Sequence, residues 1–166
     1  MKRQLEKKGR IRKRKRRTLP PEMQKYELRT TFLSDPLSVR RALEKVLLKL
    51  QHLKTPPQDC GKVELALAEV LNNIVEHAYC ITREGKIELR ITLEKQRVKC
   101  TVSDDGLPLP NSTLPSGQLQ VLSNNTSDLP EGGFGWFLIR ELADEIQYSR
   151  AGSKNIFSFH IRLEQF

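Results

Sequence analysis

Polar side chains recur at helical spacing within the segment 61–79, GKVELALAEVLNNIVEHAY. Glu69, Asn73 and His77 stand at positions i, i+4 and i+8, so an α-helix would place them on one side, opposite an apolar side. Short polar side chains in this arrangement can supply ligands for a hard metal ion. After Lys62 this polar side contains no Lys or Arg, although a solvated helix face usually includes cations. Taken alone, an ordinary solvated face is still the simpler interpretation.

A second polar pattern, Ser103-Asp104-Asp105-Gly106, follows an expected strand. A carboxylate at the end of a strand can accept a hydrogen bond from an amino group such as that of adenine. Gly106 would let the backbone turn directly after it. An Asp-Gly pair after a strand is also an everyday turn, and by itself the motif favours the turn.

A third pattern, Glu131-Gly132-Gly133-Phe134-Gly135, precedes an expected helix. Glycines at this place let a phosphate approach backbone N–H groups at the positive end of the helix. The motif lacks the Lys-Ser/Thr pair of a P-loop and the glycine spacing of a dinucleotide-binding fold, so neither of those sites is expected.

Hydrophobic periodicity and turn residues define the elements that must position these three sites. In chain order we expect a strand at 26–32, a helix after the cap at 34–36 that stops at 55–57, a helix at 61–79, a hairpin of strands at 86–94 and 97–104, a loop at 106–133, a helix at 136–144, and strands at 145–149 and 155–163. This order predicts an α+β two-layer sandwich, with helices on one face of a mixed, largely antiparallel sheet. The long loop exceeds the usual length of a connection, which indicates a functional lid or a linker.

The composition is that of one soluble globular domain. The chain has 166 residues, of which 37% are hydrophobic and 30% charged. No apolar stretch reaches the roughly 18 residues of a membrane span, and no signal peptide is recognisable, so we expect a cytoplasmic protein without membrane contact. The three cysteines, at 60, 80 and 100, are too far apart for zinc-type pairs and are expected to be free thiols.

Most of the net charge of +9 lies in the N-terminal tail. Residues 1–25 hold 12 Lys and Arg and 2 acidic residues, which leaves 17 basic and 18 acidic residues for 26–166. The tail is too polar to bury a core and is expected to be disordered. A contact with nucleic acid through Arg10 to Arg17 is one interpretation, and an upstream start codon, with Met23 as the true start, is the simpler one.

In this order the three patterns resemble the N, G1 and G2 boxes of the histidine-kinase-like ATPase superfamily, also called GHKL. The most specific stretches are AEVLNNIVEHAY at 68–79 and GGFGWFLIRELADEI at 132–146, with Asp104-Asp105-Gly106 between them. The resemblance covers residues 26–166 and is closest to the small bacterial anti-sigma factors that are serine/threonine-protein kinases. It implies the Bergerat-type ATPase fold, with ATP and Mg²⁺ as cofactors.

The resemblance also implies roles for individual residues in phosphoryl transfer. Asn73 would bind a Mg²⁺ ion that bridges the ATP phosphates, and Glu69 would orient or deprotonate the attacking hydroxyl. Asp104 would bind the adenine amino group, and Gly106 would allow its close approach.

The remaining implied contacts surround the phosphates and the lid. Gly133 and Gly135, with Phe134 between them, would cradle the phosphates, and residues 107–131 would form the ATP lid. His77 matches the end of the N box.

Two features depart from the family pattern. Asn155 stands near the last strand, where many members have a Thr. Residues 107–131 contain no Lys or Arg that could contact the γ-phosphate.

The function that the resemblance implies is an anti-sigma regulatory factor that phosphorylates a Ser or Thr of a STAS-type anti-anti-sigma protein and also holds a sigma factor. Such proteins commonly form homodimers, and the first helix offers a candidate interface. The alternative is a nucleotide-responsive binding module with little or no kinase activity. A DNA- or RNA-contacting protein that acts through its basic tail is a third class.

Other ATPases of the superfamily are less expected. A sensor histidine kinase needs a helical segment with a phosphoaccepting His before the ATPase domain, and residues 1–25 contain no His. Gyrase-, Hsp90- and MutL-like ATPases need further domains.

Overall fold

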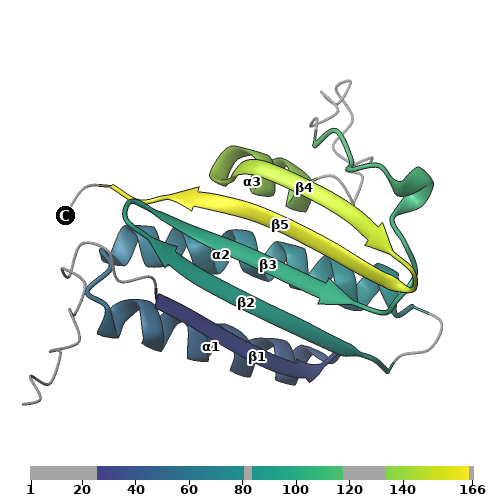
Figure 1. Cartoon of the computed structure of the whole chain (residues 1–166), viewed down its shortest axis with the longest axis horizontal. Helices are drawn as coiled ribbons and strands as arrows, with labels where there is room; N and C mark the ends of the chain where they lie inside the picture. The colour runs from purple at the N-terminus through teal and green to yellow at the C-terminus, as the bar shows by residue number, and fades with distance from the viewer. Residues whose placement is uncertain (1–25, 81–83, 118–133, 165–166) are drawn as a thin grey trace, which may run out of the picture.

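Five strands and three α-helices lie in the described part of the chain, which in this computed structural model comprises residues 26–80, 84–117 and 134–164 (Figure 1). The strands are β1 (Tyr26–Leu33), β2 (Lys86–Glu94), β3 (Arg97–Asp104), β4 (Asp144–Ala151) and β5 (Lys154–Arg162). The helices are α1 (Pro36–His52), α2 (Pro57–Asn73) and α3 (Phe134–Leu142), with a π-helical turn, η2 (Ile74–Ala78), and a 3-10 turn, η3 (Pro110–Ser112). The basic tail, Gly133 and most of the predicted lid lie outside the described residues.

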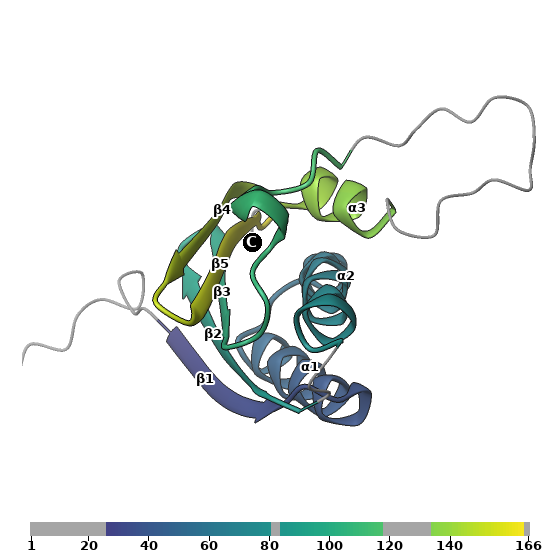
Figure 2. The same cartoon turned by 90° about the vertical axis from the view of Figure 1, so that its right-hand side faces the viewer.

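The strands form one sheet in the order β1-β2-β3-β5-β4. Each of the four described strand pairs is antiparallel, so over these residues the sheet is wholly antiparallel and not mixed. All three helices lie on one face of this sheet, as the view in Figure 2 shows. The predicted α+β two-layer sandwich is confirmed.

The core lies between the sheet and the helices, because apolar residues alternate along the strands and recur every three or four residues along the helices. Its fully buried side chains include Val46 and Leu50 of α1, Val63, Leu67 and Leu71 of α2, Ile139 of α3, and Ile87, Leu89, Val98, Val102, Phe159 and Ile161 of the strands. Both predicted hairpins are present, with Glu94 opposite Arg97 and Ala151 opposite Lys154.

The first helix begins as predicted. The carboxylate of Asp35 accepts a hydrogen bond of 2.9 Å from the backbone N–H of Ser38, and Pro36 occupies the first turn.

The second helix differs from its prediction at both ends. It begins at Pro57 and not at Gly61, because a proline in the first helical turn loses no intrahelical hydrogen bond. At its other end the α-helix stops at Asn73 and the chain continues as the π-helical turn η2. The α-helical wheel drawn through His77 therefore no longer holds after Asn73, so the i, i+4, i+8 stripe is wrong at its last position.

The third helix ends at Leu142, two residues before its predicted end, because Asp144 already pairs with His160 in the sheet. The register shifts between Asp144 and Gln147, where Glu145 has a φ of 51°.

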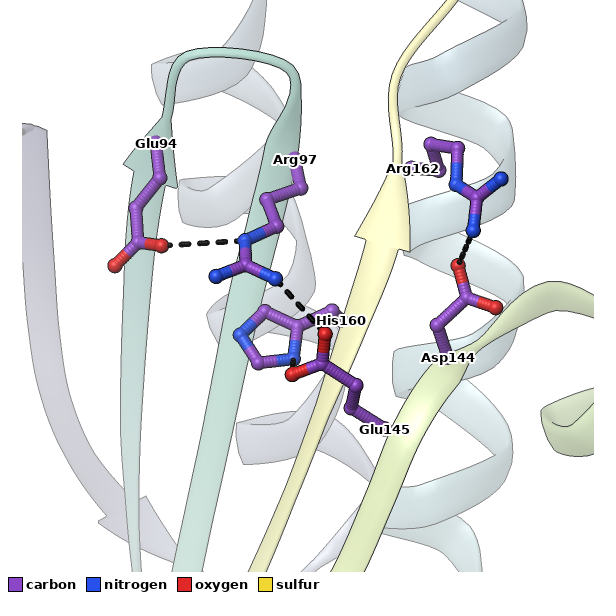
Figure 3. A network of polar contacts seen from close by, with 6 residues as sticks. All are labelled: Glu94, Arg97, Asp144, Glu145, His160 and Arg162. Atoms are coloured by element: carbon purple, nitrogen blue, oxygen red, sulfur yellow. Dashed lines mark hydrogen bonds and ion pairs between the residues drawn. The ribbon is translucent and has the colours of Figure 1, made fainter.

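A cluster of charged side chains lies on the face of the sheet opposite the helices, as Figure 3 shows. Glu145 contacts Arg97 of β3 at 3.0 Å, and its other oxygen lies 3.2 Å from Nδ1 of His160, at ion-pair distance without hydrogen-bond geometry. Glu94 pairs with the same arginine, and Arg162 pairs with Asp144. This cluster joins β2, β3, β5 and β4 on the side away from the predicted site. Within the described ranges, no helix is long and apolar enough to cross a membrane.

Candidate functional site

Glu69 on α2 and Gly135 on α3 are in direct contact. A β-carbon built on Gly135 would lie 2.6 Å from Oε2 of Glu69 and 3.7 Å from Nδ2 of Asn73. Helix α3 thus approaches the polar side of α2 at a residue without a side chain. The structure thus brings the first predicted pattern, in the second helix, next to Gly135, the last residue of the third pattern.

The side chain of Asn73 has a defined orientation. Its Nδ2 donates a hydrogen bond of 2.8 Å to the backbone carbonyl of Glu69, one helical turn earlier. Because a backbone carbonyl can only accept a hydrogen bond, the amide atom that faces it must be the nitrogen. Oδ1 of Asn73 therefore points away from the Glu69 carbonyl. Oδ1 accepts no hydrogen bond from the described residues and can act as an oxygen ligand.

The π-helical turn η2 connects the helix to the second pattern. The backbone N–H of Leu107 donates a hydrogen bond of 2.9 Å to the carbonyl of Ala78. A β-carbon on Gly106 would lie 2.6 Å from that carbonyl oxygen, so a side chain at this position would force two backbone segments apart. Single π-helical turns within helices occur frequently at functional sites. His77 is exposed on this turn, and the described residues give it no hydrogen bond.

Asp104 is almost completely buried, with 4% of its surface exposed. Its Oδ1 accepts hydrogen bonds from the backbone N–H of Gly106 at 2.8 Å and from Nδ2 of Asn155 at 2.9 Å. Burial raises the pKa of this carboxyl above its ordinary value, and the two hydrogen bonds and the nearby Arg150 guanidinium partly oppose that shift. Its second oxygen, Oδ2, accepts no hydrogen bond from the described residues and remains an acceptor for a ligand.

Asn155 lies beside Asp104, although it stands where many family members have a Thr. Its Nδ2 also contacts the carbonyl oxygens of Gly106 and Leu107, at 3.3 and 3.1 Å. Its Oδ1 accepts hydrogen bonds from the hydroxyl of Tyr148 at 2.8 Å and from the guanidinium of Arg150 at 2.5 Å. The amide therefore fastens the turn after β3 to the last hairpin.

Three further residues of this region, Tyr79, Tyr148 and Arg150, were not predicted from the sequence. The hydroxyl of Tyr79 donates to the carbonyl of Lys86 and accepts from the backbone N–H of Asp105, which holds the turn that follows Asp104. Tyr148 and Arg150 contact Asn155, as described above. A signal for these two existed, because a two-residue loop at 152–153 sets Arg150 opposite Asn155.

The segment that enters the predicted lid is held against α3. Arg140 donates two hydrogen bonds to the carbonyl of Pro115, at 3.0 and 2.6 Å. Gly117 has a φ of +66°, and a β-carbon there would lie 2.9 Å from the carbonyl oxygen of Trp136. Figure 2 shows this segment running from the end of β3 to α3.

The residues present fit a nucleotide with a metal ion. Gly135 lets α3 approach Glu69 and Asn73 closely, because a side chain at this position would collide with the Glu69 carboxylate. Within the described ranges, no group of three or more His, Cys, Asp and Glu residues gathers around one point. An ion at Oδ1 of Asn73 would therefore take most of its oxygen ligands from phosphates and water, as Mg²⁺ commonly does.

Known proteins resemble this chain over most of its described residues. The family model described as "Histidine kinase-like ATPase domain" matches residues 32–160. Serine-protein kinase RsbW of Bacillus mycoides is 33% identical over 112 residues, which cover 64% of this chain and 68% of the relative. RsbW of Bacillus cereus strain AH187 is 32% identical over the same length.

Two more distant similarities cover only part of larger proteins. Blue-light-activated histidine kinase 2 of Erythrobacter litoralis is 27% identical over 131 residues, which span 75% of this chain and 34% of that protein. The crystal structure of the RsbU and RsbW domains of Rv1364c from Mycobacterium tuberculosis aligns with a TM-score of 0.58 and 17% identity, over 83% of this chain and 32% of that one, and so supports the fold alone. The family model and the RsbW relatives together show that the chain belongs to the histidine kinase-like ATPase family, on the branch of the RsbW proteins.

Proposed function

We propose that this chain binds ATP and transfers its γ-phosphoryl group to a Ser or Thr of a STAS-type anti-anti-sigma protein, and that it also holds a sigma factor. The observation that carries the proposal is the contact of Glu69 with Gly135. It brings a carboxylate that can take a proton next to the first turn of α3, where a residue without a side chain would let phosphates approach. The RsbW relatives are serine-protein kinases by name, which supports the same activity here.

In the proposed reaction the hydroxyl oxygen of the substrate forms a bond to the γ-phosphorus. The bond between that phosphorus and the oxygen bridging to the β-phosphate breaks, and the electron pair leaves with ADP. Glu69 accepts the hydroxyl proton, as a general base positioned beside the phosphates. Positioning and charge neutralisation supply most of the rate in phosphoryl transfer.

Other residues hold the nucleotide in this proposal. Oδ1 of Asn73 binds Mg²⁺, which would neutralise charge on the phosphates. Oδ2 of Asp104 accepts a hydrogen bond from the adenine amino group, and hydrogen bonds from Gly106 and Asn155 hold that carboxylate in place. Gly133, Phe134 and Gly135 contact the phosphates. His77, in the turn that follows α2, lies at the edge of the site.

The proposal extends to the organisation of the protein. Residues 26–166 form the ATPase domain, residues 107–131 close over ATP as a lid, and the basic tail at 1–25 is not part of that domain. The protein acts in the cytoplasm as a homodimer, and the phosphorylation state of its STAS partner determines whether the sigma factor is released.

The test is transfer of radiolabelled γ-phosphate from ATP to a panel of STAS-domain proteins from the same organism. Glu69→Gln keeps the shape of the side chain but accepts no proton, so transfer is expected to fall by 100-fold or more, on the order of a general-base contribution, with ATP binding retained. Glu64→Gln is the matched control, because Glu64 is exposed on the same helix.

Two other outcomes would contradict the proposal. Full activity of Glu69→Gln would remove this residue from the mechanism. ATP binding by the native chain without transfer to any STAS protein would instead favour the nucleotide-responsive binding module.

A further inference from the structure

Polar residues of three adjacent strands stand side by side at one end of the sheet. In the strand register Asp104 of β3 is opposite Asn155 of β5, which is in turn opposite Arg150 of β4. Tyr148 precedes Arg150 by two residues and therefore lies on the same face of β4. The row connects the edge strand β4 to the buried carboxylate of Asp104, which is proposed to bind the adenine of the nucleotide.

The hydrogen bonds along this row have a single direction. The backbone N–H of Leu109 donates to the hydroxyl of Tyr148 at 3.1 Å, so the one proton of that hydroxyl is available for Asn155. Arg150 has only donors, and it too points at Oδ1 of Asn155. The opposite end of the amide, Nδ2, then faces Asp104.

The reversed orientation of Asn155 would be unfavourable at every contact. Its Nδ2 would face the donors of Tyr148 and Arg150, and its Oδ1 would face the carboxylate of Asp104 and two backbone carbonyls. Asn155 is 4% exposed, so water offers little compensation. Tyr148 and Arg150 thus determine which end of the amide meets Asp104.

Asp104 is held as an acceptor for this reason. Its Oδ1 is occupied by two donors, and its Oδ2, which accepts no hydrogen bond from the described residues, is left for a donor on the ligand. If Asn155 were free to turn, its carbonyl oxygen would repel the carboxylate and favour a protonated or displaced Asp104.

We propose that Tyr148 and Arg150 are positioning residues that set the base selectivity of the nucleotide site through Asn155. They favour a purine that carries an amino group at position 6 over one that carries a carbonyl oxygen there. This inference rests on the proposed function, because it presumes that a nucleotide base meets Asp104.

The experiment compares the affinities for ATP and for inosine triphosphate, which has a carbonyl oxygen in place of the amino group, by calorimetry with the full chain. The native protein is expected to prefer ATP. Tyr148→Phe and Arg150→Met should each lower the ratio of the ATP affinity to the inosine triphosphate affinity about tenfold. This is the effect expected for the loss of one orienting hydrogen bond, and most of it should come from weaker binding of ATP. Arg150→Lys keeps a donor and should restore most of the ratio.

The control is Arg162→Met, which removes an arginine of the same sheet whose partner Asp144 lies in the cluster on the other face. Its ratio should equal that of the native chain. Arg150 is exposed, so its variants carry the test even if Tyr148→Phe does not fold.

The possible failures are distinguishable. A native protein that binds both nucleotides equally, or folded variants with an unchanged ratio, would overturn the positioning role and leave the kinase proposal standing. A native protein that binds neither nucleotide would overturn the proposed function itself.

Discussion

Oε2 of Glu69 lies 2.6 Å from the point that a β-carbon on Gly135 would occupy. This separation is shorter than any ordinary contact with carbon, so a side chain at position 135 could not occupy the same space as the Glu69 carboxylate. Glu69 and Gly135 are 66 positions apart in the chain, and their helices meet here. The geometry explains why a residue without a side chain stands next to the proposed general base.

Gly135→Ala is therefore predicted to impair phosphoryl transfer more than folding. The new methyl group would displace the end of a flexible carboxylate, which moves at little cost to the fold. We expect transfer to drop about tenfold to 100-fold, because misplacing a catalytic group by about 1 Å can cost a factor of that order. The temperature of unfolding should change by only a few degrees. Rates of transfer and thermal unfolding would be measured on the same preparation.

Gly61→Ala is the matched control for this variant. Gly61 is also helical, but a β-carbon there has no neighbour within 4 Å. Alanine should raise the free energy of unfolding by about 0.5–1 kcal/mol through its higher helix propensity, with activity unchanged. Equal transfer rates in the two alanine variants would contradict the assigned role of Gly135.

The buried position of Asp104 predicts a pH dependence of nucleotide binding. Burial raises the pKa of its carboxyl, and Oδ1 already accepts two hydrogen bonds, so a proton would go to Oδ2. Protonation would turn the acceptor for the base amino group into a donor. Affinity for ATP should therefore fall as the pH drops through the raised pKa, by up to about tenfold per pH unit.

The measurement is the ratio of the affinities of the native protein for ATP and for inosine triphosphate across pH, since this ratio cancels the titration of the nucleotide phosphates. The ratio should decline toward acid pH. A constant ratio would show that the ionised form of Asp104 is not what binds the base.

His160 predicts a pH dependence of stability that is independent of the nucleotide site. Burial lowers its pKa below 6.5, the charge of Arg97 lowers it further, and Glu145 opposes the shift. Between the lowered pKa of the folded protein and the value of 6.5 in the unfolded chain, the unfolded chain binds more protons than the folded one. The free energy of unfolding therefore rises with pH in this window, and the contribution of His160 to stability reaches its full value above pH 6.5.

Urea unfolding between about pH 5 and pH 7.5 would test this. The slope should decrease in His160→Gln and persist in His52→Gln, which alters an exposed histidine at the end of α1. A slope that His160→Gln leaves unchanged would assign the pH dependence to other groups.

The sequence was sufficient for the features that depend on local pattern. Alternating residues in β2 and β3 and the cap at Asp35 were predictable, because strand periodicity and capping chemistry act over a few residues. The approximate places of Glu69, Asn73 and Asp104 followed from the order of the motifs.

Features that depend on contacts between distant segments were not predictable in this way. The change to a π-helical turn at Ile74 is accompanied by the contact of Ala78 with Leu107, which lies 29 residues further along the chain. The contacts of Tyr148 and Arg150 with Asn155 depend on the register of the last hairpin. A two-residue turn sets that register, but strand propensity alone does not reveal it.

The most direct test of the proposed nucleotide site is ATP binding by calorimetry, with and without Mg²⁺, to the native chain, Asn73→Ala and Asp104→Asn. We predict micromolar-range binding, on the order of −8 kcal/mol, that depends on Mg²⁺ and collapses in both variants. These residues lie on α2 and at the end of β3, so a common loss would unite the two patterns in one nucleotide site. Absence of ATP binding by the folded native chain, or undiminished binding in both variants, would contradict it.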